Sequence, residues 1–214
     1  MFIVWYSAVM SYDIYAYKSS HKDPSIEEAE ALVNLEIPSN KGDNFLQEKI
    51  ALALVESNPK LERFKFDYDK IARSLNTTVE KAKDQFNHIE LNSAEGELPF
   101  QFIINKTDLT MSMPYWYDDK KKVAELFSEA KKYLQIIYGS VNYHVYDPQT
   151  KQVCLSDEFD VEKAKDTYLG ALQRIGSQLK KPEIAPVRKN KISLRLVYVI
   201  VAILGFLYAI FSNK

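Results

Sequence analysis

Cysteine, glycine and an excess of one charge are the features that this sequence lacks. Its 214 residues include one cysteine and six glycines, and 28 Lys and Arg balance 29 Asp and Glu to a formal net charge of −1. A single cysteine excludes an internal disulfide framework and a thiolate metal cluster within one chain. The phosphate-loop and nucleophile-elbow patterns GxGxxG, GxxxxGK[ST] and GxSxG do not occur. The sequence therefore predicts neither a cofactor nor a metal.

The near-neutral total hides an uneven distribution of charge. Residues 180–214 contain seven Lys and Arg and one acidic residue, Glu183, which leaves 21 basic and 28 acidic residues in 1–179. The body of the chain is therefore acidic and its end is basic. An acidic body argues against binding of nucleic acid, because such binding relies on Lys and Arg to neutralise phosphates.

The end of the sequence has the composition of a membrane anchor. Residues 196–211 carry no charge and no polar stripe, and 192–211 would cross a hydrocarbon core of about 30 Å with Arg195 near one end. Basic residues gather on the preceding side, at Lys181, Arg188, Lys189 and Lys191. The positive-inside rule assigns that side to the cytoplasm. We therefore expect a single-pass, tail-anchored protein in the lipid bilayer, with weak self-association through the small residues Gly205 and Ala209.

Composition divides the rest of the chain into three parts. Residues 1–9 form an apolar extension that we interpret as an upstream start ahead of Met10 or as a first strand; a signal peptide is the alternative, but the basic residues that open one are absent. Residues 10–179 have the composition of a soluble domain. Residues 180–191 are rich in basic residues and proline and are expected to form a linker.

Periodicity predicts an α+β domain in which an antiparallel sheet of about four to six strands packs with helices. Alternating apolar residues predict strands at 11–18, 88–91, 100–104, 109–115, 141–145 and 152–155. Helical spacing and capping residues predict helices at 26–37, 44–57, 68–75, 77–86, 118–139 and 160–179. Two expected hairpins make the pairing antiparallel, and the helices are partly segregated from them.

A run of aromatic residues, Tyr115 to Tyr117, ends the expected strand at 109–115. Exposed aromatic side chains anchor partners, although core packing is the alternative, and strand alternation would bury Tyr115 and turn Trp116 outward. The strand expected at 141–145 would place its even-numbered side chains on an outer, solvated face. The candidate binding residues are therefore Trp116, Tyr117, Asp118, His144 and Tyr146.

Residues that often carry chemistry show no recognisable spacing. The histidines His21, His88 and His144 have no second His or Cys at a metal-ligand interval. Cys154 is expected to be a buried, inert thiol. Pairs of acidic residues adjoin turns or helix starts, where carboxylates act as caps. No catalytic residue is assigned, and we lean against an enzyme.

Several stretches together resemble a family of uncharacterised bacterial proteins. They are MSYDIYAYK at 10–18, NPKLERFKFDYDKIARSLN at 58–76, HIELNS at 88–93, MPYW at 113–116 and VYDPQ at 145–149. The resemblance covers about residues 10–175 and implies a compact bacterial domain that starts at Met10. It implies no activity or site residues, and the apolar C-terminal segment is not part of it. With a bacterial source, the expected location is the inner membrane.

Three functional hypotheses follow from these patterns. The first is a membrane-tethered cytoplasmic domain that binds an unknown protein partner, in one form an immunity-type protein that neutralises a toxin. The second is a membrane-associated enzyme on a small or lipid-borne substrate, which would need Asp118 or Asp119 to meet His144 in one pocket. The third is a tethered DNA-binding regulator built on the helices at 68–86, although acidic residues at the start of the second helix disfavour it.

Overall fold

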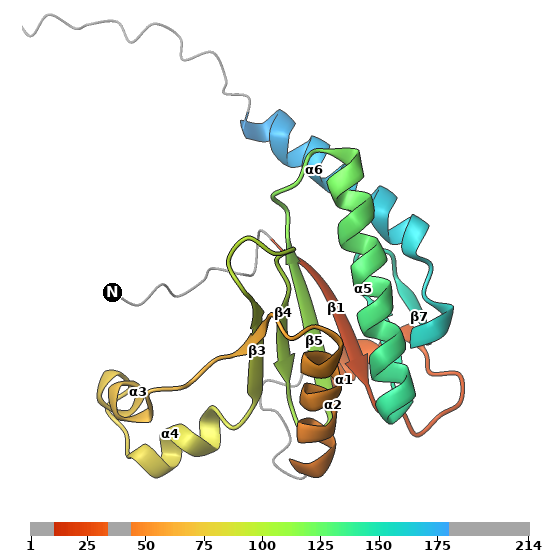
Figure 1. Ribbon diagram of the computed structural model, residues 1–214. Helices are drawn as coiled ribbons and strands as arrows, with labels where there is room; N and C mark the ends of the chain where they lie inside the picture. Colours follow the sequence, from red (N-terminus) through yellow and green to blue (C-terminus); the bar gives the residue numbers. More distant parts are fainter. Residues whose placement is uncertain (1–10, 34–43, 180–214) are drawn as a thin grey trace, which may run out of the picture. The chain divides into compact units, whose positions relative to one another are not determined.

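The fold is known from a computed structural model that describes residues 11–33 and 44–179. Its seven strands are β1 Ser11–Tyr17, β2 Leu61–Arg63, β3 Ile89–Ser93, β4 Gln101–Ile104, β5 Asp108–Pro114, β6 His144–Asp147 and β7 Gln152–Leu155. Its six α-helices are α1 Ile26–Val33, α2 Asn44–Ser57, α3 Tyr68–Ser74, α4 Val79–Gln85, α5 Lys120–Val141 and α6 Val161–Leu179, with a 3₁₀ turn at Ser156–Glu158. The predicted α+β class is confirmed (Figure 1).

All seven strands form one antiparallel sheet in the order β2-β3-β4-β5-β1-β6-β7. The chain divides into two compact units, Met1–Ile175 and Gly176–Lys214, and the sheet belongs to the first. No helix in the described part of the chain is both long and apolar enough to cross a membrane. The predicted extension at 1–9, linker at 180–191 and membrane segment at 192–211, with Gly205 and Ala209, lie outside the described residues.

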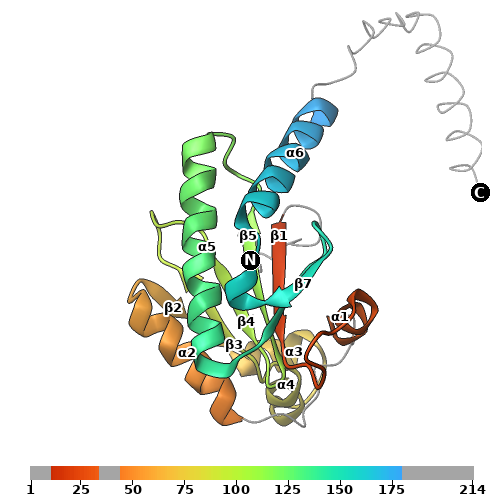
Figure 2. The ribbon, with the colours of Figure 1, turned by 90° about the vertical axis from the view of Figure 1, so that its right-hand side faces the viewer.

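The first face of the sheet carries the main core. Alternate residues of β1, which are Tyr12, Ile14 and Ala16, are fully buried, because the pleat turns every second side chain to the same side. The long helix α5 and the helices α2 and α6 lie over this face (Figure 2). The core is rich in aromatic rings, and the Tyr12 and Phe127 rings meet edge to face with centroids 5.4 Å apart.

The second face is covered only in part by described helices. Helix α1 packs on β1 and β7, where Tyr17, Ala29 and Tyr146 form a small buried cluster. Helices α3 and α4 pack against each other at the β3 side of the sheet (Figure 1). Strands β2 to β5 thus have one face buried against the core, while their other face carries mostly polar side chains, half-buried or exposed, with Ile103 and Pro114 as apolar members.

A buried carboxylate ties the centre of the sheet to the β6–β7 turn. Asp147 is fully buried, and its Oδ2 atom accepts hydrogen bonds from the hydroxyls of Tyr12 (2.6 Å) and Thr150 (2.7 Å). Its Oδ1 atom accepts from the backbone N–H groups of Gln149 (2.9 Å) and Thr150 (3.2 Å). Burial, and next the Asp147 carboxylate, raise the pKa of the Tyr12 phenol, so its hydroxyl keeps the proton that it donates. Four donors offset the cost of burying this acid.

Two predicted features of the secondary structure are wrong, for physical reasons. The described residues form seven strands, more than the four to six predicted, because the charged segment Leu61–Arg63 pairs with β3. This pairing is a tertiary contact, and the sequence pattern of the segment does not predict it. The helix predicted to end at Gly139 continues to Val141, and Asn142 caps it in the left-handed conformation with φ 53°. Asparagine tolerates that conformation, so β6 begins only at His144.

Smaller corrections concern one helix face and one cap. Helical spacing predicts Leu46 on the buried face of α2, but the helix buries Gln47. The Gln47 amide donates to the carbonyl oxygens of Asn87 (3.1 Å) and Ile104 (2.6 Å), and these hydrogen bonds make its burial stable. The sequence predicts Thr77 as the cap of the following helix α4, but the cap is Thr78, which accepts from the Lys81 N–H at 3.3 Å.

Two matched tyrosine substitutions test the role of the Asp147 contact. Tyr12→Phe removes a donor to a buried carboxylate and should lower the free energy of unfolding by about 1.5–3 kcal/mol. Tyr17→Phe removes a buried hydroxyl that has no hydrogen-bond partner among the described residues, so it should leave stability unchanged or raise it. Urea unfolding followed by circular dichroism measures both values. Equal losses in the two variants would contradict this assignment.

Candidate functional site

The five predicted binding residues fall into two groups at opposite ends of β1. Trp116, Tyr117 and Asp118 follow Pro114, which pairs with Ser11 at the start of that strand. The other two, His144 and Tyr146, pair with Tyr17 and Tyr15 towards the end of the strand. The structure therefore does not assemble them into one site.

The acid–histidine pairing of the enzyme hypothesis is also separated. Asp119 caps the start of α5, and His144 lies two residues beyond Asn142, which caps the end of that helix. A helix of 22 residues is about 33 Å long at 1.5 Å per residue. Proton transfer needs hydrogen-bond reach, so neither Asp118 nor Asp119 exchanges a proton directly with His144.

His144 and Tyr146 are buried, whereas the sequence pattern predicts a solvated face. His144 is 8% exposed and its Nε2 atom lies 3.0 Å from the carbonyl oxygen of Lys22. Tyr146 is 4% exposed and donates to the Glu30 carboxylate at 2.9 Å. The reason is tertiary, because α1 and the loop before it fold back over this end of the sheet. Tyr146 thus holds α1 through Glu30, His144 holds the loop before α1, and both side chains are too buried to contact a partner.

The aromatic run is placed much as its alternation predicts. Tyr115 is half-buried against the core and stacks on Tyr168 with ring centroids 4.7 Å apart, while Trp116 is 54% exposed. Tyr117 is half-buried, and the Lys122 ammonium lies 5.5 Å from its ring centroid. Asp118 is exposed. These residues form one accessible corner at the start of α5.

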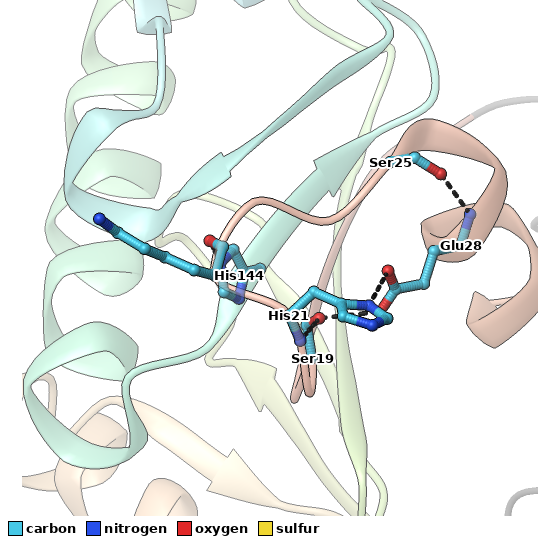
Figure 3. Close-up of polar contacts among 6 residues, drawn as sticks. Ser19, His21, Ser25, Glu28 and His144 are labelled. Carbon is cyan, nitrogen blue, oxygen red and sulfur yellow. Dashed lines mark hydrogen bonds and ion pairs between the residues drawn. The ribbon is translucent and has the colours of Figure 1, made fainter.

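A polar cluster that sequence reasoning does not reveal surrounds Glu28 in the first turn of α1. The carboxylate accepts from the Ser19 hydroxyl at 2.8 Å, and the Nδ1 atom of His21 lies 2.8 Å from its other oxygen (Figure 3). The Glu28 N–H in turn donates to the Ser25 hydroxyl at 3.2 Å. These contacts join residues from the loop after β1 to a helix, so only the folded chain brings them together. They lower the pKa of Glu28 from its ordinary 4.5, with the His21 contact as the first cause.

This cluster positions α1 and does not form an activated nucleophile. The Ser19 hydroxyl donates to the Glu28 carboxylate, whose pKa is lowered by the His21 contact, so this carboxylate is too weak a base to take the hydroxyl's proton. Cys154 is half-buried, and burial, followed by the acids Glu158, Asp147 and Asp157, raises the pKa of its thiol to about 11. Among the described residues, no group of His, Cys, Asp and Glu has the geometry to hold a metal ion.

A row of polar side chains crosses the second face of the sheet. The cross-strand partners run from Glu62 on β2 through Asn92, Gln101 and Ser112 to Asp13 on β1. We call these five residues the polar row. At about 4.8 Å between neighbouring strands it is about 19 Å long.

The row is acidic at both ends and its neighbours add acid. Glu90 lies beside it, and its Oε1 atom accepts from the amides of Asn92 (2.8 Å) and Gln101 (2.9 Å). Asp13 has one oxygen that accepts from Ser11 at 3.1 Å and one buried oxygen without a partner in the described part of the chain. The strand positions of β1 to β5 that face this side include no Lys or Arg. The surface is therefore a set of hydrogen-bonding groups with a negative field.

Comparison with known proteins adds no relative. No protein-family model, curated protein or solved structure matches the chain. The resemblance to a family of uncharacterised bacterial proteins therefore stays a prediction, and the function has to be argued from the surface itself.

Acid should loosen α1 through the Glu28 cluster. The folded-state pKa of Glu28 is lowered, so its stabilising contribution is complete above its ordinary value of 4.5 and is lost as the pH falls through the folded-state value. We expect Glu28→Gln to raise the hydrogen-exchange rates of α1 amides at neutral pH and to flatten their dependence on pH below about 5. Glu27→Gln is the control, because the hydrogen bonds that lower the pKa of Glu27 come from its own backbone and from Ser25, whereas Ser19 and His21 bind Glu28. Identical exchange in both variants would contradict the role given to Glu28.

Cys154 should react slowly with alkylating reagents in the folded chain. With a pKa of about 11, its thiolate fraction at pH 8 is about a hundredfold smaller than for a thiol with the ordinary value of 9.0. The rate of modification by iodoacetamide, followed by mass spectrometry, should therefore rise with pH to beyond 10 and should increase strongly in urea. A modification rate that reaches half its maximum near pH 9 in the native protein would show that the pKa of the thiol is not raised.

Proposed function

We propose that the chain is a membrane-tethered cytoplasmic interaction domain that binds a basic protein partner across the polar row, in the manner of an immunity-type protein that neutralises a toxin. The observation that supports this best is the row itself, five polar side chains in register on strands that otherwise build the core. Strands of an antiparallel sheet hold their side chains at fixed spacing, so such a surface is preorganised for recognition.

The charge of the surface sets the chemistry of the partner. Glu62, Glu90 and Asp13 present carboxylates, and Asn92 and Gln101 present amides that donate and accept. A partner with Lys and Arg would gain charge-assisted hydrogen bonds here and would be steered by the acidic body of the chain. The same charge disfavours nucleic acid, which agrees with the acidic composition of residues 1–179.

Helix α1 sets one limit of the proposed interface. It covers Tyr17 and Tyr146 at the β6 and β7 side of the same face, so the polar row ends where that cover begins. The other limit is β2, a strand of three residues at the edge of the sheet. A binding face bounded in this way has the size to contact one compact protein. The expected anchor at 192–211 would raise the effective concentration of the domain at the membrane.

Site-specific photo-crosslinking in cells tests this interface. A photoreactive benzoylphenylalanine at Thr110, which lies on the same face as the row, should yield one discrete crosslinked product with a basic protein. The same residue at Ser128, on the exposed side of α5, is the matched control and should yield no such product. The double variant Asp13→Asn, Glu62→Gln should lower the yield at Thr110 at least about tenfold.

The charge control for that experiment is a second double variant. Glu125→Gln with Asp166→Asn removes the same charge from exposed positions on α5 and α6 and should leave the yield unchanged. Equal losses in the two double variants would mean that net charge alone guides binding. Equal products from Thr110 and Ser128 would overturn the proposed interface.

A further inference from the structure

We infer that the corner formed by the end of β5 and the first turn of α5 lies against the headgroups of a lipid bilayer, so that one end of the sheet faces the membrane. We define this corner as Trp116, Tyr117, Lys120, Lys121 and Lys122. The inference rests on the proposed function in one respect, because it presupposes that the chain is tethered to a membrane. It adds which side of the domain meets the lipid.

The aromatic residues of the corner have the chemistry of a membrane interface. Trp116 is 54% exposed, and Tyr117 lies next to it with its ring half-buried. Tryptophan and tyrosine concentrate at the level of lipid headgroups, because each combines an apolar ring with one polar group. A large exposed ring at a strand end is therefore suited to the region between water and hydrocarbon.

Basic residues of the corner complement anionic headgroups. Lys120, Lys121 and Lys122 are all exposed, and Lys122 lies over the Tyr117 ring at 5.5 Å. Two acids lie close by, but the Asp119 carboxylate accepts from the Lys121 N–H at 2.8 Å as the cap of α5. Asp118 is exposed and offsets one positive charge. Three ammonium groups against two carboxylates leave an excess of positive charge beside the aromatic rings.

The described chain begins close to this corner, and helix α6 passes it before the first unit ends. Ser11, where the described chain begins, pairs with Pro114, and Figures 1 and 2 show the start of β1 and the start of α5 at the same end of the sheet. The Tyr168 hydroxyl of α6 donates to the Pro114 carbonyl at 2.7 Å, and the first unit ends at Ile175, two helical turns further on.

The sequence beyond these two points has the composition of segments that bind membranes. Residues 1–9 are apolar, and 180–191 are basic and precede the apolar run at 192–211. A tether that leaves the unit near the corner would hold Trp116 and the lysines within reach of the headgroups. We commit to lipid as the occupant, because an aromatic and basic corner lies beside Ser11, where the described chain begins, and beside the helix that leads to the basic and apolar C-terminal sequence.

Fluorescence quenching in vesicles that contain this chain as their only protein tests whether the corner lies at the lipid headgroups. The full-length chain carries two tryptophans, so Trp5→Phe makes Trp116 the single reporter. The chain is reconstituted into phosphatidylcholine vesicles with 30% phosphatidylserine and with acyl chains brominated near the headgroups. Trp116 should be quenched, and Lys120→Glu, Lys121→Glu, Lys122→Glu together should reduce that quenching at least about twofold. The matched control reverses three exposed lysines elsewhere, Lys65, Lys81 and Lys163.

Carbonate extraction of the same vesicles separates the two proposals. Both triple variants should stay in the membrane fraction, because neither alters residues 192–211. A chain that resists extraction while Trp116 is unquenched would assign the corner to a protein contact and overturn this inference, leaving the tether intact. Equal quenching in the two triple variants would also overturn it. A chain that washes off would overturn the tether and this inference together.

Discussion

The arrangement depends on one buried carboxylate that must be hydrogen-bonded where it lies. Asp147 ends β6 inside the protein, and four donors converge on it, one of them the Tyr12 hydroxyl from β1. A carboxyl group is tolerated in such a place only when hydrogen-bond donors replace the water that it has lost. The Tyr12 contact joins the central strand of the sheet to the β6–β7 turn, and the aromatic core of Tyr115, Phe127 and Tyr168 packs around the Tyr12 ring.

This constraint divides the second face of the sheet into two unequal parts. With β6 and β7 fixed beside β1, α1 packs over Tyr17 and Tyr146 and is fastened there by the Glu28 cluster. Strands β2 to β5 carry their polar side chains on the same face beyond that cover. The proposed binding surface is thus the part of this face that α1 leaves uncovered, and the proposed lipid-facing corner lies at one end of the sheet.

Local patterns in the sequence predict most of the fold, because they report contacts between near neighbours. The alternation in β1 and in the β4–β5 hairpin, and the bounds of α2, are confirmed. The strand β2 and the burial of His144 are not visible in the sequence, since both follow from segments that meet only after folding. The sequence does not predict the Glu28 cluster for the same reason. Alternate positions in the strands predict the polar side chains of the row, but only the order of the strands shows which of them lie side by side.

A double-mutant cycle on Tyr12 and Asp147 tests the central claim most directly. The free energies of unfolding of the wild type, Tyr12→Phe, Asp147→Asn and the double variant are measured by urea denaturation under one set of conditions. We expect a coupling energy of about 1.5–3 kcal/mol, the range for a buried hydrogen bond to a carboxylate. A coupling energy near zero would contradict it, because the two side chains would then stabilise the sheet independently.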